Sequence, residues 1–124
     1  MRTKSKLERK NCKVCKHDKL IRMKHCYDCG KCVATFDHHC VWVDNCVGEK
    51  NRHIFYLCVL TNLVAIVNAF CMLVAEMWRQ GSKETYQISF LSFLGILIGG
   101  LVSLFVMHTY MMMANLTTCT FWHK

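Results

Sequence analysis

The sequence predicts an α-helical integral membrane protein in which a cysteine-rich module precedes two transmembrane helices. Three observations lead to this fold class. Residues 1–53 carry 13 of the 16 Lys and Arg side chains of the 124-residue chain, whereas residues 54–124 are mostly apolar. The apolar part contains two uncharged runs, each long enough to cross a bilayer. Of the ten Cys residues, seven lie between Cys12 and Cys46.

We expect six segments along the chain. The uncharged run Ile54 to Ala75 has 22 residues, which at about 1.5 Å per residue covers the hydrocarbon thickness of a bilayer. A second run, Ile88 to Met107, has 20 residues. The alternative is a pair of buried helices in a soluble core, but so short a chain has too little polar surface to cover both runs. The segments are a basic N-terminal segment (1–11), a cysteine-rich domain (12–53), a transmembrane helix (54–78), a short lumenal or extracellular loop (79–87), a second transmembrane helix (88–113) and a C-terminal tail (114–124).

The charge distribution predicts the orientation of the two helices. The first 53 residues are strongly basic and Lys124 ends the chain, whereas the loop at 79–87 is nearly balanced in charge. The positive-inside rule therefore places both termini in the cytosol. A cysteine cluster in this reducing compartment binds metal far more often than it forms disulfides. We expect the membrane to be an endomembrane, of the Golgi or endoplasmic reticulum, or the plasma membrane.

The cysteines and histidines of the module are spaced as metal ligands. From Cys12 to Cys46 the pattern reads C-x2-C-x9-HC-x2-C-x2-C-x4-DHHC-x5-C. A Cys-x-x-Cys turn brings two thiolates to about 2.3 Å from one tetrahedral Zn²⁺. The loops between the ligands offer few apolar residues for a core, so metal binding would supply folding free energy. The pattern therefore predicts structural zinc.

A count of the ligands leaves one thiol over. Two closed tetrahedral sites use eight ligands, and six Cys, His25 and one of the pair His38 and His39 supply them. Cys40 and the other histidine are then spare, beside the carboxylate of Asp37. A thiol next to an imidazole and a carboxylate is the arrangement that nucleophilic thiol chemistry needs. The alternative is that Cys40 is itself a ligand and that Cys46 or another thiol is free.

The run from Cys12 to Phe55 resembles the cysteine-rich domain of the DHHC-type protein S-acyltransferases, or palmitoyltransferases. The two apolar runs look like the third and fourth membrane helices of that family, so the chain would be a fragment of a four-helix bundle whose first two helices precede Met1. The resemblance rests on Phe36, Asp37, His38, His39, Cys40, Trp42, Asn45, Cys46, Gly48, Asn51 and Phe55.

The resemblance implies two crossed zinc sites. Their ligands alternate along the chain, so that neighbouring residues belong to different sites. His39 would be a ligand, and His38 and Cys40 would both be spare. One site would use Cys12, Cys15, His25 and Cys32, and the other Cys26, Cys29, His39 and Cys46.

The resemblance also implies a two-step acyl transfer. Cys40 would take a long-chain acyl group, such as palmitoyl, from acyl-CoA to become an acyl-enzyme. It would then pass this group to a cytosolic cysteine of a membrane-associated protein substrate. His38 would act as the general base, and Asp37 would orient it.

Five further residues are candidates for contact with the acyl-CoA. The resemblance suggests Lys19, Arg22 and Lys24 for the CoA phosphates, although these cations are equally typical of a solvated basic face near anionic lipid. Trp42 and Phe55 would lie at the mouth of the slot for the acyl chain.

Three positions depart from the family pattern. The family usually has Pro where Val41 and Leu20 stand, and its T-T-x-E motif, which begins here at Thr117 and Thr118, ends in Thr120 instead of Glu. We expect Thr118 to lie near Asp37 and Thr120 to loosen that link. These departures are the support for an alternative to the working enzyme, a catalytically impaired or truncated DHHC-like membrane zinc scaffold. A nucleic-acid binder fits the net charge of +8, but no helix with a base-reading pattern is present, so we expect no nucleic-acid partner.

Overall fold

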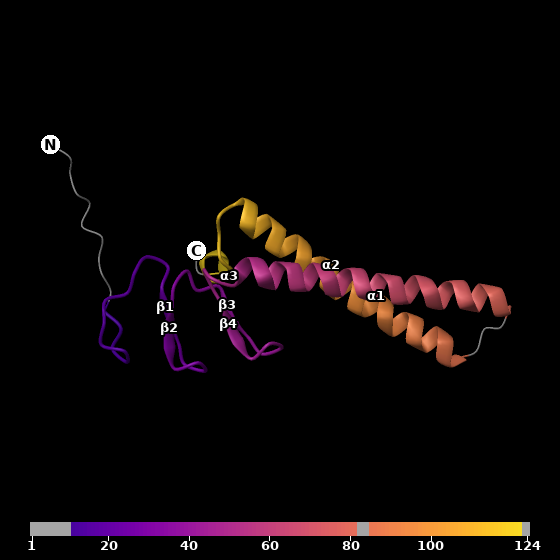
Figure 1. The fold of residues 1–124 in the computed structure, drawn as a ribbon, viewed down its shortest axis with the longest axis horizontal. Coiled ribbons are helices and arrows are strands. Elements are labelled where there is room, and N and C mark those ends of the chain that lie inside the picture. Colours follow the sequence, from indigo (N-terminus) through magenta and orange to yellow (C-terminus); the bar gives the residue numbers. More distant parts are fainter. Residues whose placement is uncertain (1–10, 82–84, 123–124) are drawn as a thin grey trace. The chain divides into compact units, whose positions relative to one another are not determined.

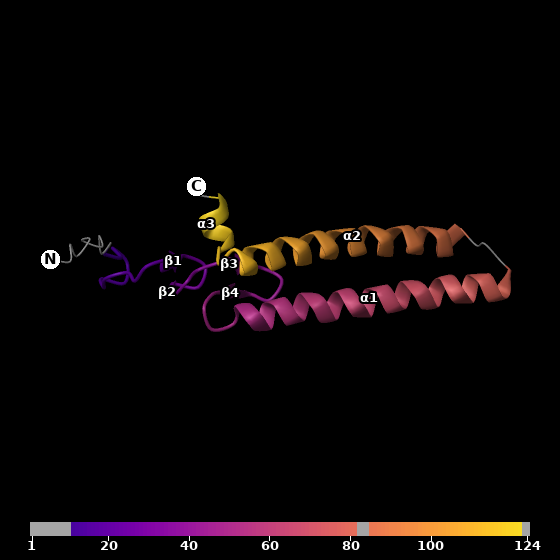
Figure 2. The same cartoon turned by 90° about the horizontal axis from the view of Figure 1, so that it is seen from above.

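A computed structural model describes residues 11–81 and 85–122 and divides the chain into two compact units. The first unit combines the chain up to Arg52 with the segment from Asn115 onward, and the second runs from His53 to Ala114. Residues 1–10 of the basic segment expected at 1–11, and residues 82–84 of the loop expected at 79–87, lie outside the described residues. Figures 1 and 2 show the elements of both units from two directions.

The first unit contains two short β-hairpins and a short helix. Strands β1 (Lys24–Cys26) and β2 (Lys31–Val33) pair antiparallel, as do β3 (His38–Cys40) and β4 (Asn45–Val47). Helix α3 (Thr118–Trp122) comes from the other end of the chain. Each strand has three residues and offers few apolar side chains, so the fold of this unit depends on its polar and sulfur contacts.

A close approach joins the two hairpins at Gly48. A Cβ atom built there would lie 2.7 Å from Cγ1 of Val33 and 2.9 Å from the carbonyl oxygen of Ala34. Asn51 closes the turn after β4, because its side chain accepts from the Gly48 N–H at 2.9 Å and donates to the Cys46 carbonyl at 2.9 Å. Glycine is therefore required at position 48 for packing.

Two long helices form the second unit. Helix α1 (Arg52–Gln80), whose first residue belongs to the first unit, and helix α2 (Thr85–Met113) each have 29 residues, or about 43 Å at 1.5 Å per residue. They run antiparallel (Figures 1 and 2). The Tyr56 ring stacks on Phe105 with 5.0 Å between centroids, and the Tyr56 hydroxyl lies 3.1 Å from Oγ1 of Thr109. Each helix is long and apolar enough to cross a membrane, as the sequence predicts.

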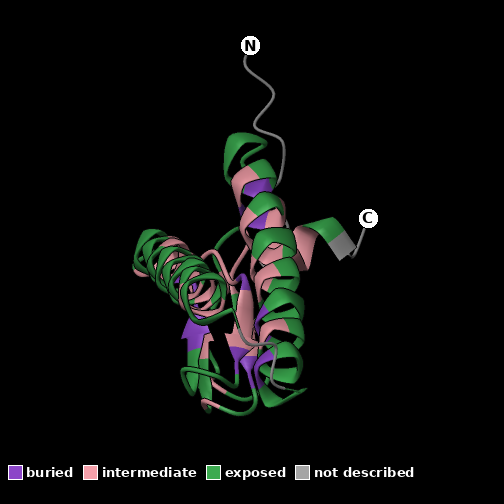
Figure 3. Ribbon diagram, turned by 90° about the vertical axis from the view of Figure 1, so that its right-hand side faces the viewer, coloured by how far each residue is buried: buried purple, intermediate pink, exposed green. Residues whose placement is uncertain are grey.

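Most described residues of these helices are exposed, as the colours of the ribbon in Figure 3 show. Val59 alone is buried among the described side chains of α1, and the four buried in α2 are Gln87, Leu94, His108 and Met111. A soluble helix pair would have to hide its apolar surface, whereas a bilayer accepts it. The expected fold class, a cysteine-rich module with two membrane-capable helices, is therefore confirmed.

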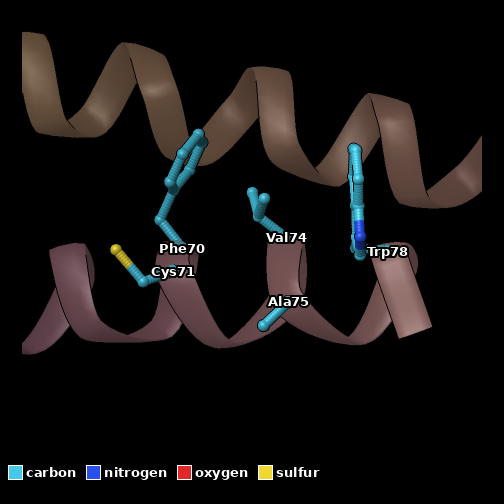
Figure 4. Close-up of a pocket in the computed structure, with 5 residues that line it drawn as sticks. All are labelled: Phe70, Cys71, Val74, Ala75 and Trp78. Carbon is cyan, nitrogen blue, oxygen red and sulfur yellow. The ribbon is translucent and has the colours of Figure 1, made fainter.

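An open apolar groove runs along α1 toward its C-terminal end (Figure 4). It contains none of the residues expected to take part in catalysis or metal binding. Its surface is almost entirely hydrocarbon, which suits contact with lipid. The residues that line it are Phe70, Cys71, Val74, Ala75 and Trp78.

Candidate active site and metal centres

The first group of possible metal ligands lies between the N-terminal loop and the β1–β2 hairpin. Cys12, Cys15, His25 and Cys32 place their ligand atoms within 4.8 Å of one another. Nδ1 of His25 lies 3.3 Å from the Cys15 sulfur and 3.7 Å from the Cys32 sulfur. The Cys-x-x-Cys turn is closed by a 3.4 Å contact from the Cys15 N–H to the Cys12 sulfur. Such N–H donors stabilise a thiolate.

The second group joins the two hairpins. Cys26, Cys29, His39 and Cys46 also place their ligand atoms within 4.8 Å of one another. Nδ1 of His39 lies 3.4, 3.7 and 3.8 Å from the sulfurs of Cys29, Cys26 and Cys46. The sulfurs of Cys29 and Cys46 are 3.3 Å apart.

Strand alternation explains why neighbouring residues enter different groups. His25 and Cys26 are consecutive on β1, so their side chains point to opposite faces of the hairpin. His25 pairs with Cys32 across the hairpin, which puts both on one face and in the first group. His39 pairs with Cys46 in the same way in the second hairpin. The crossed grouping is thus a direct result of the two-residue period of a strand.

Both groups fit a tetrahedral metal ion. With Zn–S near 2.3 Å and Zn–N near 2.0–2.1 Å, tetrahedral ligand atoms lie about 3.4–3.8 Å apart. The sulfur–nitrogen distances quoted above, 3.3–3.8 Å, are within about 0.1 Å of that range. Burial and the neighbouring Cys12 and Cys15 raise the pKa of Cys32 to about 12. Burial and the neighbouring Cys29 and Cys26 raise the pKa of Cys46 to about 12 in the same way. A bound dication would relieve this repulsion.

Asp37 is the centre of a separate polar network. The residue is only 1% exposed. The Thr118 N–H donates to Oδ1 at 3.0 Å, and the Thr118 hydroxyl donates to Oδ2 at 2.6 Å. Nδ1 of His38 lies 2.8 Å from Oδ2, and Nε of Arg52 lies 3.9 Å from Oδ1. Both carboxylate oxygens therefore accept hydrogen bonds from Thr118, which lies 81 positions away in the sequence.

These donors keep Asp37 ionised. Burial by itself would raise the pKa of the carboxyl, but the hydrogen bonds from His38 and Thr118 lower it to about 2. A carboxylate facing Nδ1 of His38 favours the tautomer with its proton on that nitrogen. Nε2 is then the basic nitrogen of the neutral ring.

Cys40 lies in neither metal-ligand group. Among the seven cysteines of the module, all within the described residues, the other six belong to the two groups. Cys40 is buried and lies two residues after His38 on β3, so the two side chains share one face of the strand. His39, between them, faces the second metal group. One strand thus separates a metal-binding face from a face with a spare thiol and a held imidazole.

The residues expected to contact acyl-CoA are more dispersed. Lys24 is exposed at the start of β1, and Lys19 is half-buried. Arg22 is engaged with Asn115, donating to its carbonyl oxygen at 2.5 Å and to its side-chain oxygen at 3.3 Å. Trp42 is 92% exposed in the β3–β4 turn. Phe55, in the other unit, packs edge-on against His108 with 5.1 Å between ring centroids.

Sequence reasoning overlooked two parts of this network. Arg52 contacts both Asp37 and the Leu116 carbonyl oxygen. Thr117 and Thr120 bond to each other at the start of α3. Thr117 is the N-cap and Thr120 the third helical residue, which is the spacing of a capping box with Thr in place of the usual Glu or Gln. This spacing is visible in the sequence. No comparable sequence signal marks Arg52.

The site lies within a match to the DHHC palmitoyltransferase family model that extends over residues 5–124. The chain belongs to this family. It is 32% identical over 118 residues to the probable protein S-acyltransferase 15 of Arabidopsis thaliana, covering 90% of this chain and 46% of the relative. It is 37% identical over 123 residues to the human palmitoyltransferase ZDHHC18, covering 88% of this chain and 30% of the relative. The resemblance seen in the DHHC tetrad is confirmed.

A third relative matches over a shorter stretch of the chain. The palmitoyltransferase SWF1 of Saccharomyces cerevisiae is 42% identical over 62 residues, which is 50% of this chain and 18% of that protein. The chain therefore spans less than half the length of each of these three relatives.

Proposed function

We propose that this chain carries the catalytic centre of a protein S-acyltransferase that works through an acyl-Cys40 intermediate. The observation that carries the proposal is the separation of residues between the two faces of β3. Cys40 lies outside both metal groups and on the face of His38, whose Nδ1 lies 2.8 Å from the buried Asp37 carboxylate. The relatives' names, palmitoyltransferase and protein S-acyltransferase, support the same reaction.

In the first step, His38 takes the proton of the Cys40 thiol. The sulfur attacks the carbonyl carbon of a long-chain acyl-CoA thioester, a new C–S bond forms, and the bond to the CoA sulfur breaks. The proton on His38 then passes to the leaving CoA thiolate. Asp37 stabilises the imidazolium that exists between these transfers and keeps the ring oriented.

In the second step, the acyl group moves to a protein substrate. A cytosolic cysteine thiol of a membrane-associated protein loses its proton to His38 and attacks the acyl-Cys40 thioester. Cys40 leaves as a thiolate and recovers the proton. No oxidant or reductant is needed, because one thioester replaces another at each step.

The same proposal assigns Zn²⁺ to the two Cys₃His groups as a structural ion. Their donor sets and distances suit zinc, and in this role the metal holds the hairpins without taking part in the chemistry. Lys19, Lys24, Trp42 and Phe55 remain candidates for contact with acyl-CoA. Arg22 is a weaker candidate, since its guanidinium already holds Asn115.

We further propose that both termini face the cytosol, in an endomembrane or the plasma membrane. Two membrane-capable helices joined by a short connection return the chain to its starting side. The basic charge of residues 1–53 selects the cytosol for that side.

Zinc-loaded protein incubated with labelled palmitoyl-CoA tests the proposal. We expect a hydroxylamine-labile label on Cys40 that Cys40→Ser abolishes and the control Cys58→Ser retains, since Cys58 is exposed on α1. Labelling in this chain alone should be slower than in a longer chain with further helices. Absence of acyl-Cys40 in the full-length protein with both metals bound would establish a scaffold instead of an enzyme.

A further inference from the structure

The turn that leads into α3 places two donors of Thr118 on the Asp37 carboxylate. Thr118 is the first residue of a five-residue helix. So short a helix has little stability of its own, because helix initiation fixes several residues for each hydrogen bond gained. Its first turn needs other contacts to hold Thr118 in place.

Thr117 and Thr120 supply those contacts by capping each other. The Thr117 N–H donates to Oγ1 of Thr120 at 2.8 Å, and the Thr120 N–H lies 3.2 Å from Oγ1 of Thr117. The Thr120 hydroxyl also donates to the Thr117 carbonyl at 2.9 Å. Thr117 is fully buried. This is the reciprocal geometry of a capping box, with the short Thr120 hydroxyl in the place of a Glu or Gln side chain.

Position 120 is where the T-T-x-E pattern ends in Thr instead of Glu. A Thr there is expected to loosen the link to the tetrad, yet its hydroxyl closes the cap. The capped turn carries both Thr118 donors, at 3.0 and 2.6 Å from Asp37. Upstream, Arg22 and Arg52 hold the carbonyls of Asn115 and Leu116, so the segment is fixed on both sides of Thr117.

We infer that Thr120 is a positioning residue for the acyl-transfer site, acting through the Thr117 cap and Thr118 on Asp37. The inference rests on the proposed function for its effect on rate. Thr120 touches no reacting atom. Its hydroxyl sets the orientation of the donors that hold the Asp37 carboxylate against His38.

Four variants test this inference in the full-length, zinc-loaded protein. Thr120→Val removes the hydroxyl and keeps the shape, and should slow formation of acyl-Cys40 by about fivefold to thirtyfold, the rate equivalent of one lost helix cap. The half-saturating palmitoyl-CoA concentration and the zinc content should not change. Thr120→Ser and Thr120→Glu should stay within about threefold of the parent, because each can still accept from the Thr117 N–H. Thr61→Val is the matched control, since the Thr61 hydroxyl only bonds within α1.

A double-mutant cycle separates positioning from general destabilisation. If Thr120 acts through Thr118, the rate loss in Thr118→Val/Thr120→Val should be smaller than the product of the two single losses. Losses that multiply fully would overturn the inference, as would a Thr120→Ser variant as slow as Thr120→Val.

Hydrogen exchange gives a readout that does not need activity. Thr120→Val should speed amide exchange in the peptide covering residues 115–121, and Thr120→Ser should not. If the parent protein forms no acyl-Cys40, the proposed function fails, and the exchange result still decides whether the cap holds Thr118. Unchanged exchange in Thr120→Val would rule out the positioning role.

Discussion

Adjacent residues of the tetrad make different contacts because their side chains point to opposite faces of β3. His39 enters a Cys₃His group, and His38 faces Asp37. The same alternation separates His25 from Cys26. The last three residues of the tetrad thus alternate between the two faces of β3, which is why substitutions one position apart should have unrelated effects.

Substitution of the two tetrad histidines should separate these functions. We expect His38→Ala to keep two zinc ions per chain and to slow acylation of Cys40 by about 10²–10⁴-fold, the cost of losing a general base. His39→Ala should lose one zinc and destabilise the module. Metal analysis beside single-turnover acylation measures both. Equal zinc loss in the two variants would contradict the assignment.

Cys40 and Cys46, on opposite sides of the β3–β4 turn, allow a matched comparison of zinc binding. Cys40→Ser should keep both zinc ions, since Cys40 lies outside the metal groups, whereas Cys46→Ser should lose one. Elemental analysis of the purified variants distinguishes them. A zinc lost in Cys40→Ser would make Cys40 a ligand and remove the nucleophile from the proposal.

The short elements of the module depend on contacts that local sequence specifies only in part. The cysteine spacing can be read from the sequence, whereas three-residue strands are too short to leave a periodic signal. The approach of Gly48 to Val33 and the reach of Arg52 to Leu116 cannot be read from it either, because they depend on how distant segments fold together. Arg22 shows the same limit, since its bonds to Asn115 cross 93 positions.

A methyl group added at Gly48 tests how tightly this position packs against Val33. Gly48→Ala would place its Cβ 2.7 Å from Val33, and we expect a loss of about 1–3 kcal/mol in the stability of the module, the usual cost of overpacking. Gly95→Ala in α2 is the control, because nothing lies within 4 Å of that position. Thermal unfolding in detergent compares the two. Equal midpoints would show that the hairpins can shift apart at no cost.

At the scale of the whole molecule, two kinds of stabilisation are combined in one chain. The first unit is built from three-residue strands and sulfur–nitrogen clusters, and the second from two 29-residue apolar helices. The sequence predicts both because each leaves a composition signal, in cysteines and in uncharged runs. It also predicts the helices more readily than their contacts, since Tyr56 and Thr109 meet across 53 positions.

Metal removal should therefore affect the two units differently. A strong zinc chelator should unfold the hairpins, because few apolar side chains remain to hold them, while α1 and α2 stay helical in detergent. Far-UV circular dichroism should retain most of its helical signal as residues 12–50 become sensitive to protease. Loss of the helical signal together with the module would show that the membrane helices also depend on zinc.

The proposed zinc binding and acyl transfer both require the cysteine-rich module to face a reducing compartment. A glycosylation sequon inserted at Gly81 should be modified in the lumen, and sequons placed before Asn11 or after Lys124 should not. The expectation follows from the excess of Lys and Arg in residues 1–53 over the connection between the helices. Glycosylation at either terminus would show that the chain has the opposite orientation. Seven cysteines would then face an oxidising compartment, where disulfides compete with zinc and Cys40 would no longer be kept as a free thiol.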